Sequence, residues 1–134
     1  MKYALLLFLL TKTVFSYSQF FVGDSRVLAK SILDTKKIDY SEDLIEEPYK
    51  IDRISWIIEN EYQMILIFNT DDVVIKQTLI PEKKNGVNEF VKWFNEEFVV
   101  VSNTEWKNYA NGRIYNIKLE YILREPLFSI TLVE

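Results

Sequence analysis

The stretch "EWKNYANGRIYNIKLEY", residues 105–121, predicts a β-hairpin that turns at Asn111-Gly112. A two-residue turn of type I′ needs positive φ at both central residues, and Asn followed by Gly tolerates this best. In this register Trp106 faces Ile117, and a shift by one residue would move Trp106 to the polar face of the hairpin. The expected pairs are Ala110 with Arg113, Asn108 with Tyr115, Trp106 with Ile117, Thr104 with Leu119 and Ser102 with Tyr121.

One face of the predicted hairpin is apolar, because side chains alternate between the two faces of a strand. Its expected members are Trp106, Tyr115, Ile117, Leu119, Tyr121 and Leu123. The opposite face is polar, and on it Glu105 is expected to lie across from the oppositely charged Lys118. Tyr109 falls on this polar side, beside Lys107, and is therefore the aromatic residue of the hairpin that is available to a ligand.

A short helix over residues 103–110 is the alternative for the first half of the stretch. Ser102 and Glu105 have the spacing of a capping box, in which the two side chains satisfy free N–H groups at the start of a helix. Gly112 would then follow the last turn in the left-handed conformation. The hairpin is preferred because its register is internally consistent, and both alternatives place Trp106 in the core.

Upstream of this stretch, three runs have the pattern of β-strands. The middle run, residues 62–69, is apolar on both faces, which is typical of a strand inside a sheet with both sides covered. Residues 51–59 and 73–80 flank it through short connections, so we expect an antiparallel meander. A short helix is expected over residues 25–34. A longer helix over residues 86–97 has an apolar face made of Val87, Phe90, Val91, Phe94 and Phe98.

These elements predict an α+β fold of one antiparallel sheet with five or six strands, in the order α-βββ-α-βββ. One main amphipathic helix would pack on a face of the sheet. Two smaller α/β halves packed together are the alternative. A distant internal duplication is disfavoured, because the helices and hairpins of the two halves sit at different offsets. The length of 134 residues suggests a single domain, which we place at residues 19–134.

Residues 1–18, "MKYALLLFLLTKTVFSYS", have the layout of a secretory signal peptide. Lys2 precedes an apolar run, and Ser16 and Ser18 form a small-x-small pattern before Gln19. The apolar run is shorter than the roughly 20 residues of a membrane-spanning helix. We therefore expect cleavage after Ser18 and a periplasmic or extracellular protein. No Cys follows the signal, so the protein is not expected to be a lipoprotein.

The composition excludes several chemistries. The chain has no His and no Cys, which excludes Ser-His-Asp and Cys-His catalysis as well as zinc sites of the His or Cys type. With only three Gly, it has no glycine-rich loop for a phosphate group, and no cofactor is expected. Residues 19–134 hold 14 basic and 20 acidic residues, a net charge of −6. This charge argues against nucleic acid and anionic membranes as partners, whereas proteins, peptides and glycans remain.

Two chemistries based on carboxylates stay open. A hydrolase needs two acids several ångströms apart in a cleft. The candidate pairs are Glu59 with Glu61 and Glu105 with Glu120. Calcium needs six to eight oxygen ligands. Asn69, Asp71 and Asp72 supply only three side chains, which turn formation also explains, so no metal site is expected.

Three functions follow from these observations. The leading hypothesis is a non-catalytic exported module that binds a protein or peptide through the irregular acidic segment 35–50. The candidate residues of that segment are Tyr40, Glu42, Asp43, Glu46, Glu47 and Tyr49. The alternative is a glycan-binding module that uses Tyr109 and Lys107, with Tyr115 and Trp106 as further stacking surfaces. A hydrolase with two carboxylates is the third hypothesis.

Overall fold

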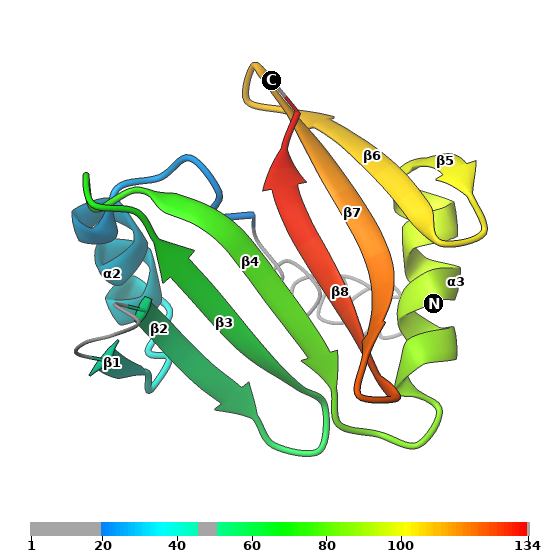
Figure 1. The fold of residues 1–134 in the computed structure, drawn as a ribbon, viewed down its shortest axis with the longest axis horizontal. Coiled ribbons are helices and arrows are strands. Elements are labelled where there is room, and N and C mark those ends of the chain that lie inside the picture. The colour runs from blue at the N-terminus through cyan, green and yellow to red at the C-terminus, as the bar shows by residue number, and fades with distance from the viewer. Residues whose placement is uncertain (1–19, 46–50, 134) are drawn as a thin grey trace, which may run out of the picture.

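In the computed structural model, which describes residues 20–45 and 51–133, an eight-stranded antiparallel sheet carries two helices on one face (Figure 1). In chain order the elements are α2 (Arg26–Thr35), β1 (Ser41–Ile45), β2 (Ile51–Ile58), β3 (Tyr62–Phe68), β4 (Val74–Pro81), α3 (Gly86–Glu97), β5 (Val99–Ser102), β6 (Glu105–Ala110), β7 (Arg113–Ile122) and β8 (Glu125–Leu132). Neither helix is long and apolar enough to cross a membrane; this holds for the described residues.

The strand order across the sheet is β1-β2-β3-β4-β8-β7-β6-β5. Each half of the chain is therefore a helix followed by a four-stranded meander, and the two meanders join through their last strands, β4 and β8. This join is short, with Gln77, Thr78 and Leu79 opposite Ile130, Ser129 and Phe128. Figure 1 shows the two meanders diverging from it.

The predicted α+β class fits this architecture, but the prediction of five or six strands and one main helix is wrong. The sheet has eight strands, and both helices contribute buried side chains. The two strands that the sequence pattern missed are the two edges of the sheet, β1 and β5. An edge strand is short and has a neighbour on one side only, so it needs little of the apolar alternation by which a strand is recognised.

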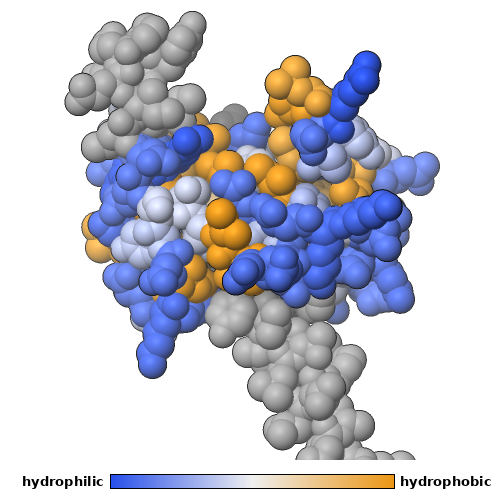
Figure 2. Space-filling view, turned by 90° about the horizontal axis from the view of Figure 1, so that it is seen from below, coloured by the Kyte–Doolittle hydropathy of each residue, from blue (hydrophilic) through white to orange (hydrophobic). Residues whose placement is uncertain are grey.

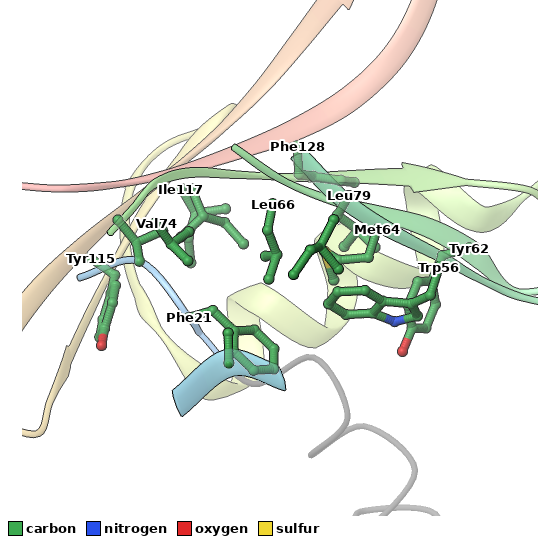
Figure 3. Close-up of a cluster of buried hydrophobic side chains, with 14 of the residues drawn as sticks. Phe21, Trp56, Tyr62, Met64, Leu66, Val74, Leu79, Tyr115, Ile117 and Phe128 are labelled. Carbon is green, nitrogen blue, oxygen red and sulfur yellow. The ribbon is translucent and has the colours of Figure 1, made fainter. Parts of the chain in front are cut away.

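The core lies between the sheet and the two helices and is continuous across both meanders (Figure 3). Phe90 of α3 connects the halves, with its ring centroid 6.0 Å from those of both Tyr62 and Phe128. Phe94 packs on Phe128 at 5.0 Å and on Trp106 at 5.4 Å. These strand residues lie on one face of the sheet, and no helix of the described residues lies on the opposite face.

The predicted hairpin is present. β6 and β7 pair with Trp106 opposite Ile117, and Asn111 and Gly112 have φ values of 56° and 71°. Trp106 is fully buried and donates its indole N–H to Asn95 Oδ1 at 2.7 Å. The alternative of a helix over residues 103–110 is therefore wrong.

The hairpin prediction fails at the far end of β7. Ser102 pairs with Glu105 in β5 and β6, so it does not face Tyr121. Tyr121 and Leu123, which the alternation assigned to the apolar face, are 64% and 94% exposed. The apolar pattern thus continues past the point where the core ends.

Candidate functional site

The acidic residues predicted to bind a partner are paired within the fold where the structure describes them. Glu42 lies 2.7 Å from Lys30 Nζ and 3.1 Å from Arg26 Nη1. The bond to Lys30, with a further contribution from Arg26, lowers the pKa of Glu42. Asp43 accepts a hydrogen bond from Arg53 Nε at 3.2 Å. Of the other predicted residues, Glu46, Glu47 and Tyr49 lie outside the described residues.

Arg26 is the centre of this charge network. Its guanidinium donates to Asp52 of β2 and, at 3.2 Å, to Asp72 in the turn before β4. It also lies 4.3 Å from the centre of the Phe68 ring, a cation–π distance. The hydrogen bond to Asp52 is the main cause that raises the pKa of Arg26. These carboxylates therefore hold edge strand β1 and helix α2 together, and they do not form a free acidic surface.

Tyr40, the remaining predicted residue of this segment, borders a gap at the edge of the sheet. Strand β1 begins at Ser41, which lies opposite Ser55 of β2. Strand β2 continues to Ile58 and pairs with β3 over its whole length. Within the described part of the chain, Trp56–Ile58 therefore have a neighbouring strand on one side only. The backbone groups of these residues that point away from β3 have no ladder partner there.

Two adjoining hollows lie along this free edge. The first has a volume of about 270 Å³ and lies between residues 39–41 and residues 55–57, and Gln63 also lines it. The second has a volume of about 310 Å³ and lies between residues 36–39 and residues 57–58. They share Asp39 and Ile57. We call the two hollows and the free edge of Trp56–Ile58 the edge slot.

The edge slot combines apolar and polar groups. Ile57 is 62% exposed. Trp56 is buried, yet its indole N–H has no hydrogen-bond partner among the described residues, which is costly for a buried donor. Burial raises the pKa of Tyr40 and lowers the pKa of Lys36. These side chains can surround a short extended segment.

The segment 36–39, which lines the second hollow opposite β2, contains a residue with a strained backbone. Lys37 follows α2 with φ 56°, and its N–H donates to Asp34 O while the N–H of Ile38 donates to Leu33 O. This is the Schellman arrangement, in which Gly usually occupies the left-handed position. Lys37 places a long cationic side chain at the second hollow instead.

The residues predicted to bind glycan lie on the other half of the sheet. Tyr109 is 60% exposed on the face without helices, and Lys107 is on the same face of β6. Trp106 and Tyr115, the further stacking residues of that hypothesis, are both buried in the core. A single exposed ring, opposite Ile114, is left of the expected platform.

Three of the four candidate carboxylates and the candidate calcium turn have local structural roles. Glu61 lies 3.5 Å from Lys83, Glu105 lies 4.0 Å from Lys118, and Glu120 accepts a hydrogen bond from Ser129 at 2.7 Å. Asn69 Oδ1 accepts the N–H groups of Asp71 and Val73, both at 3.0 Å, as an Asx turn does. No group of three or more acidic side chains able to hold a metal ion occurs in the described ranges.

Sequence reasoning found Tyr40 but not the slot beside it. The slot exists because β1 begins at Ser41, opposite Ser55, whereas β2 continues to Ile58. The length over which an edge strand pairs depends on tertiary structure and not on a local sequence pattern. The exposed Ile57 gave no signal, because its neighbours in the sequence have the same apolar character.

Comparison of the chain with protein-family models, curated proteins and solved structures finds no match.

Proposed function

We propose that this chain is an exported, non-catalytic module that binds an extended peptide segment of another protein along the free edge of β2. The observation that supports this most is the coincidence of an unpaired strand edge at Trp56–Ile58 with two joined hollows. A peptide that adds a strand to a sheet gains affinity from backbone hydrogen bonds and specificity from pockets for alternate side chains. The edge slot offers both.

The size of the slot suits a short segment. Residues Trp56–Ile58 span about 10 Å, because a strand rises roughly 3.4 Å per residue. Three or four peptide residues would pair with this length. One side chain would pack on Ile57, and another would enter the hollow beside Tyr40. Lys37 at the far end favours a peptide with an acidic residue at that position.

Two other functions have less support. A glycan site at Tyr109 would rest on one ring, since Trp106 and Tyr115 belong to the core. A hydrolase would need a cleft with two acids, whereas Glu105 and Glu120 each contact another side chain. Export rests on the signal-like pattern of residues 1–18, and mass spectrometry of the secreted protein tests it through an expected N-terminus at Gln19.

Selection of peptides tests the binding function. A displayed library of random octapeptides would be selected on the whole protein, and enriched peptides would be measured by calorimetry. We expect peptides rich in β-branched residues whose affinity falls at least about tenfold in the Ile57→Lys variant, because the cation occupies the free edge. Ile75→Lys is the matched control, since Ile75 is 48% exposed on β4, outside the slot.

The two variants also give the result that would contradict the function. If no peptide binds more tightly than about 1 mM, or if both variants bind an enriched peptide as the wild type does, the edge slot is not a peptide site.

A further inference from the structure

The β6–β7 and β7–β8 hairpins of the second meander both have positive φ at their two central turn residues, but they use different residues there. Asn111 and Gly112 connect β6 to β7 with φ values of 56° and 71°. Leu123 and Arg124 connect β7 to β8 with φ values of 50° and 68°. Both are two-residue turns, closed by the pairs Ala110–Arg113 and Ile122–Glu125.

Leu-Arg is a poor choice for this turn. Left-handed φ values bring Cβ close to the backbone, and only Gly, Asn and Asp adopt them readily. Leu has no side-chain hydrogen bond that compensates. The Asn-Gly pair of the β6–β7 hairpin shows that the same chain uses the favourable residues elsewhere. Folding therefore does not explain Leu123 and Arg124.

The residues around this turn are also apolar and exposed. Tyr121, Ile122 and Leu123 are 64%, 53% and 94% exposed. We call Tyr121–Arg124 the apical finger. It lies at the end of the sheet that also carries the β2–β3 turn (Figure 1). Seen from that end, the surface is largely hydrophilic with separate hydrophobic patches (Figure 2).

A single exposed Leu needs no explanation, because much of any protein surface is apolar. Three consecutive exposed apolar residues that run from the end of β7 into a strained turn are different, since backbone strain that folding does not require is concentrated at functional sites. A convex apolar tip is suited to insertion, and its side chains would be buried only in a concave partner surface.

We propose that the apical finger is a second protein-binding element, which inserts Leu123 into an apolar pocket of a folded partner. Arg124 is exposed and has no ion pair with any described residue, so a carboxylate at the rim of the pocket would complement it. The chain is acidic, with a net charge of −4, and Glu125 follows the finger directly. An anionic membrane, which requires clustered cations, is therefore disfavoured. This proposal does not depend on the edge slot.

Exchange of the turn residues separates stability from binding. The double variant Leu123→Asn, Arg124→Gly gives the β7–β8 hairpin the favourable Asn-Gly turn of the β6–β7 hairpin. We expect its thermal unfolding midpoint to rise by about 3 °C or more, because the strain is removed. Its affinity for the peptides selected on the edge slot should stay unchanged. A lower midpoint would contradict the strain argument and with it the proposal.

Photo-crosslinking in the producing cells identifies the partner. A photoreactive leucine analogue would replace Leu123, and the same analogue at Val27, which is 79% exposed on α2, is the matched control. We expect one protein adduct that is specific to position 123 and maps to an apolar pocket. The purified partner should bind the wild type at least tenfold more tightly than the Asn-Gly variant. Lipid adducts alone, equal adducts at both positions, or equal affinity of both forms would overturn the proposal.

Discussion

At the residue scale, Arg26 joins four parts of the first half of the fold: α2, β1, β2 and the turn before β4. Its side chain is 17% exposed, and the side chain of its partner Asp52 is 24% exposed. We expect Arg26→Met to lower the free energy of unfolding by about 2 kcal/mol, because it leaves carboxylates without their charged donor.

Urea denaturation followed by tryptophan fluorescence measures this loss. Arg53→Met is the control, since Arg53 pairs with Asp43 at 36% and 45% exposure. That exposed pair should contribute less than about 1 kcal/mol. Equal losses in the two variants would contradict the central position of Arg26.

Glu42 gives the charge network a dependence on pH. Its pKa in the folded protein is lowered below the ordinary value of 4.5, mainly by the hydrogen bond with Lys30. A lowered carboxyl pKa contributes stability above the unfolded value, and this contribution is lost as the pH falls through the folded value. The difference in unfolding free energy between wild type and Glu42→Gln should therefore be fully present above the unfolded pKa of 4.5 and decrease as the pH falls below it.

This difference should stay below about 1 kcal/mol, because the Glu42 side chain is 37% exposed and solvent screens the pair. Unfolding at a series of pH values measures it. A difference that grows on acidification would contradict the assignment.

At the element scale, the hairpin at Asn111-Gly112 was predicted well because turn chemistry and alternation agree there. The edge strands were not. "SEDLI" lacks an apolar alternation, and "VVVS" reads as a strand but was not separated from β6, because the turn at residues 103–104 contains no Gly or Pro. Tyr121 and Leu123 show a further limit. Periodicity tells which face of a strand a residue shares, but not how far the core extends along that strand.

Gly112 allows the favourable turn to be tested directly. Its φ is 71°, and a Cβ added there would meet no atom within 4 Å. We expect Gly112→Ala to lower the free energy of unfolding by about 1 kcal/mol through backbone strain alone. Gly112→Asn, which tolerates the left-handed conformation, should lose clearly less. Chemical denaturation of both variants checks this, and equal losses would mean that strain is not the cause.

At the scale of the whole molecule, the two meanders share one core although their strands join only through the short pairing of β4 with β8 among the described residues. Phe20 stacks on Tyr115 at 4.9 Å, and Asp24 accepts a hydrogen bond from Arg113 at 2.8 Å, so the segment before α2 contacts the second meander. The predicted order α-βββ-α-βββ is wrong, because each helix precedes four strands. It could not anticipate this joint core, which depends on contacts between residues far apart in sequence.

The shared core predicts that the two meanders unfold together. Phe90→Ala should lower the free energy of unfolding by about 3–5 kcal/mol, because Phe90 packs on both Tyr62 and Phe128. Native-state hydrogen exchange should show an equal loss of protection in β3 and in β7. A loss confined to β7 would show that the meanders are independent.

The edge slot was only partly predictable for the same reason. Tyr40 was selected from its place in an acidic segment, whereas the acids beside it serve ion pairs within the fold. The free edge of Trp56–Ile58 results from the unequal lengths of β1 and β2, which no local pattern reveals.

Solution NMR with an isotope-labelled protein and a selected peptide tests the edge slot most directly. We predict that the peptide shifts the backbone amides of Trp56–Ile58 and protects at least one of them from hydrogen exchange. Nuclear Overhauser contacts should place the peptide backbone beside β2 in the line of β1. Contacts confined to the exposed face around Tyr109, with unchanged exchange at Trp56–Ile58, would contradict the proposed function.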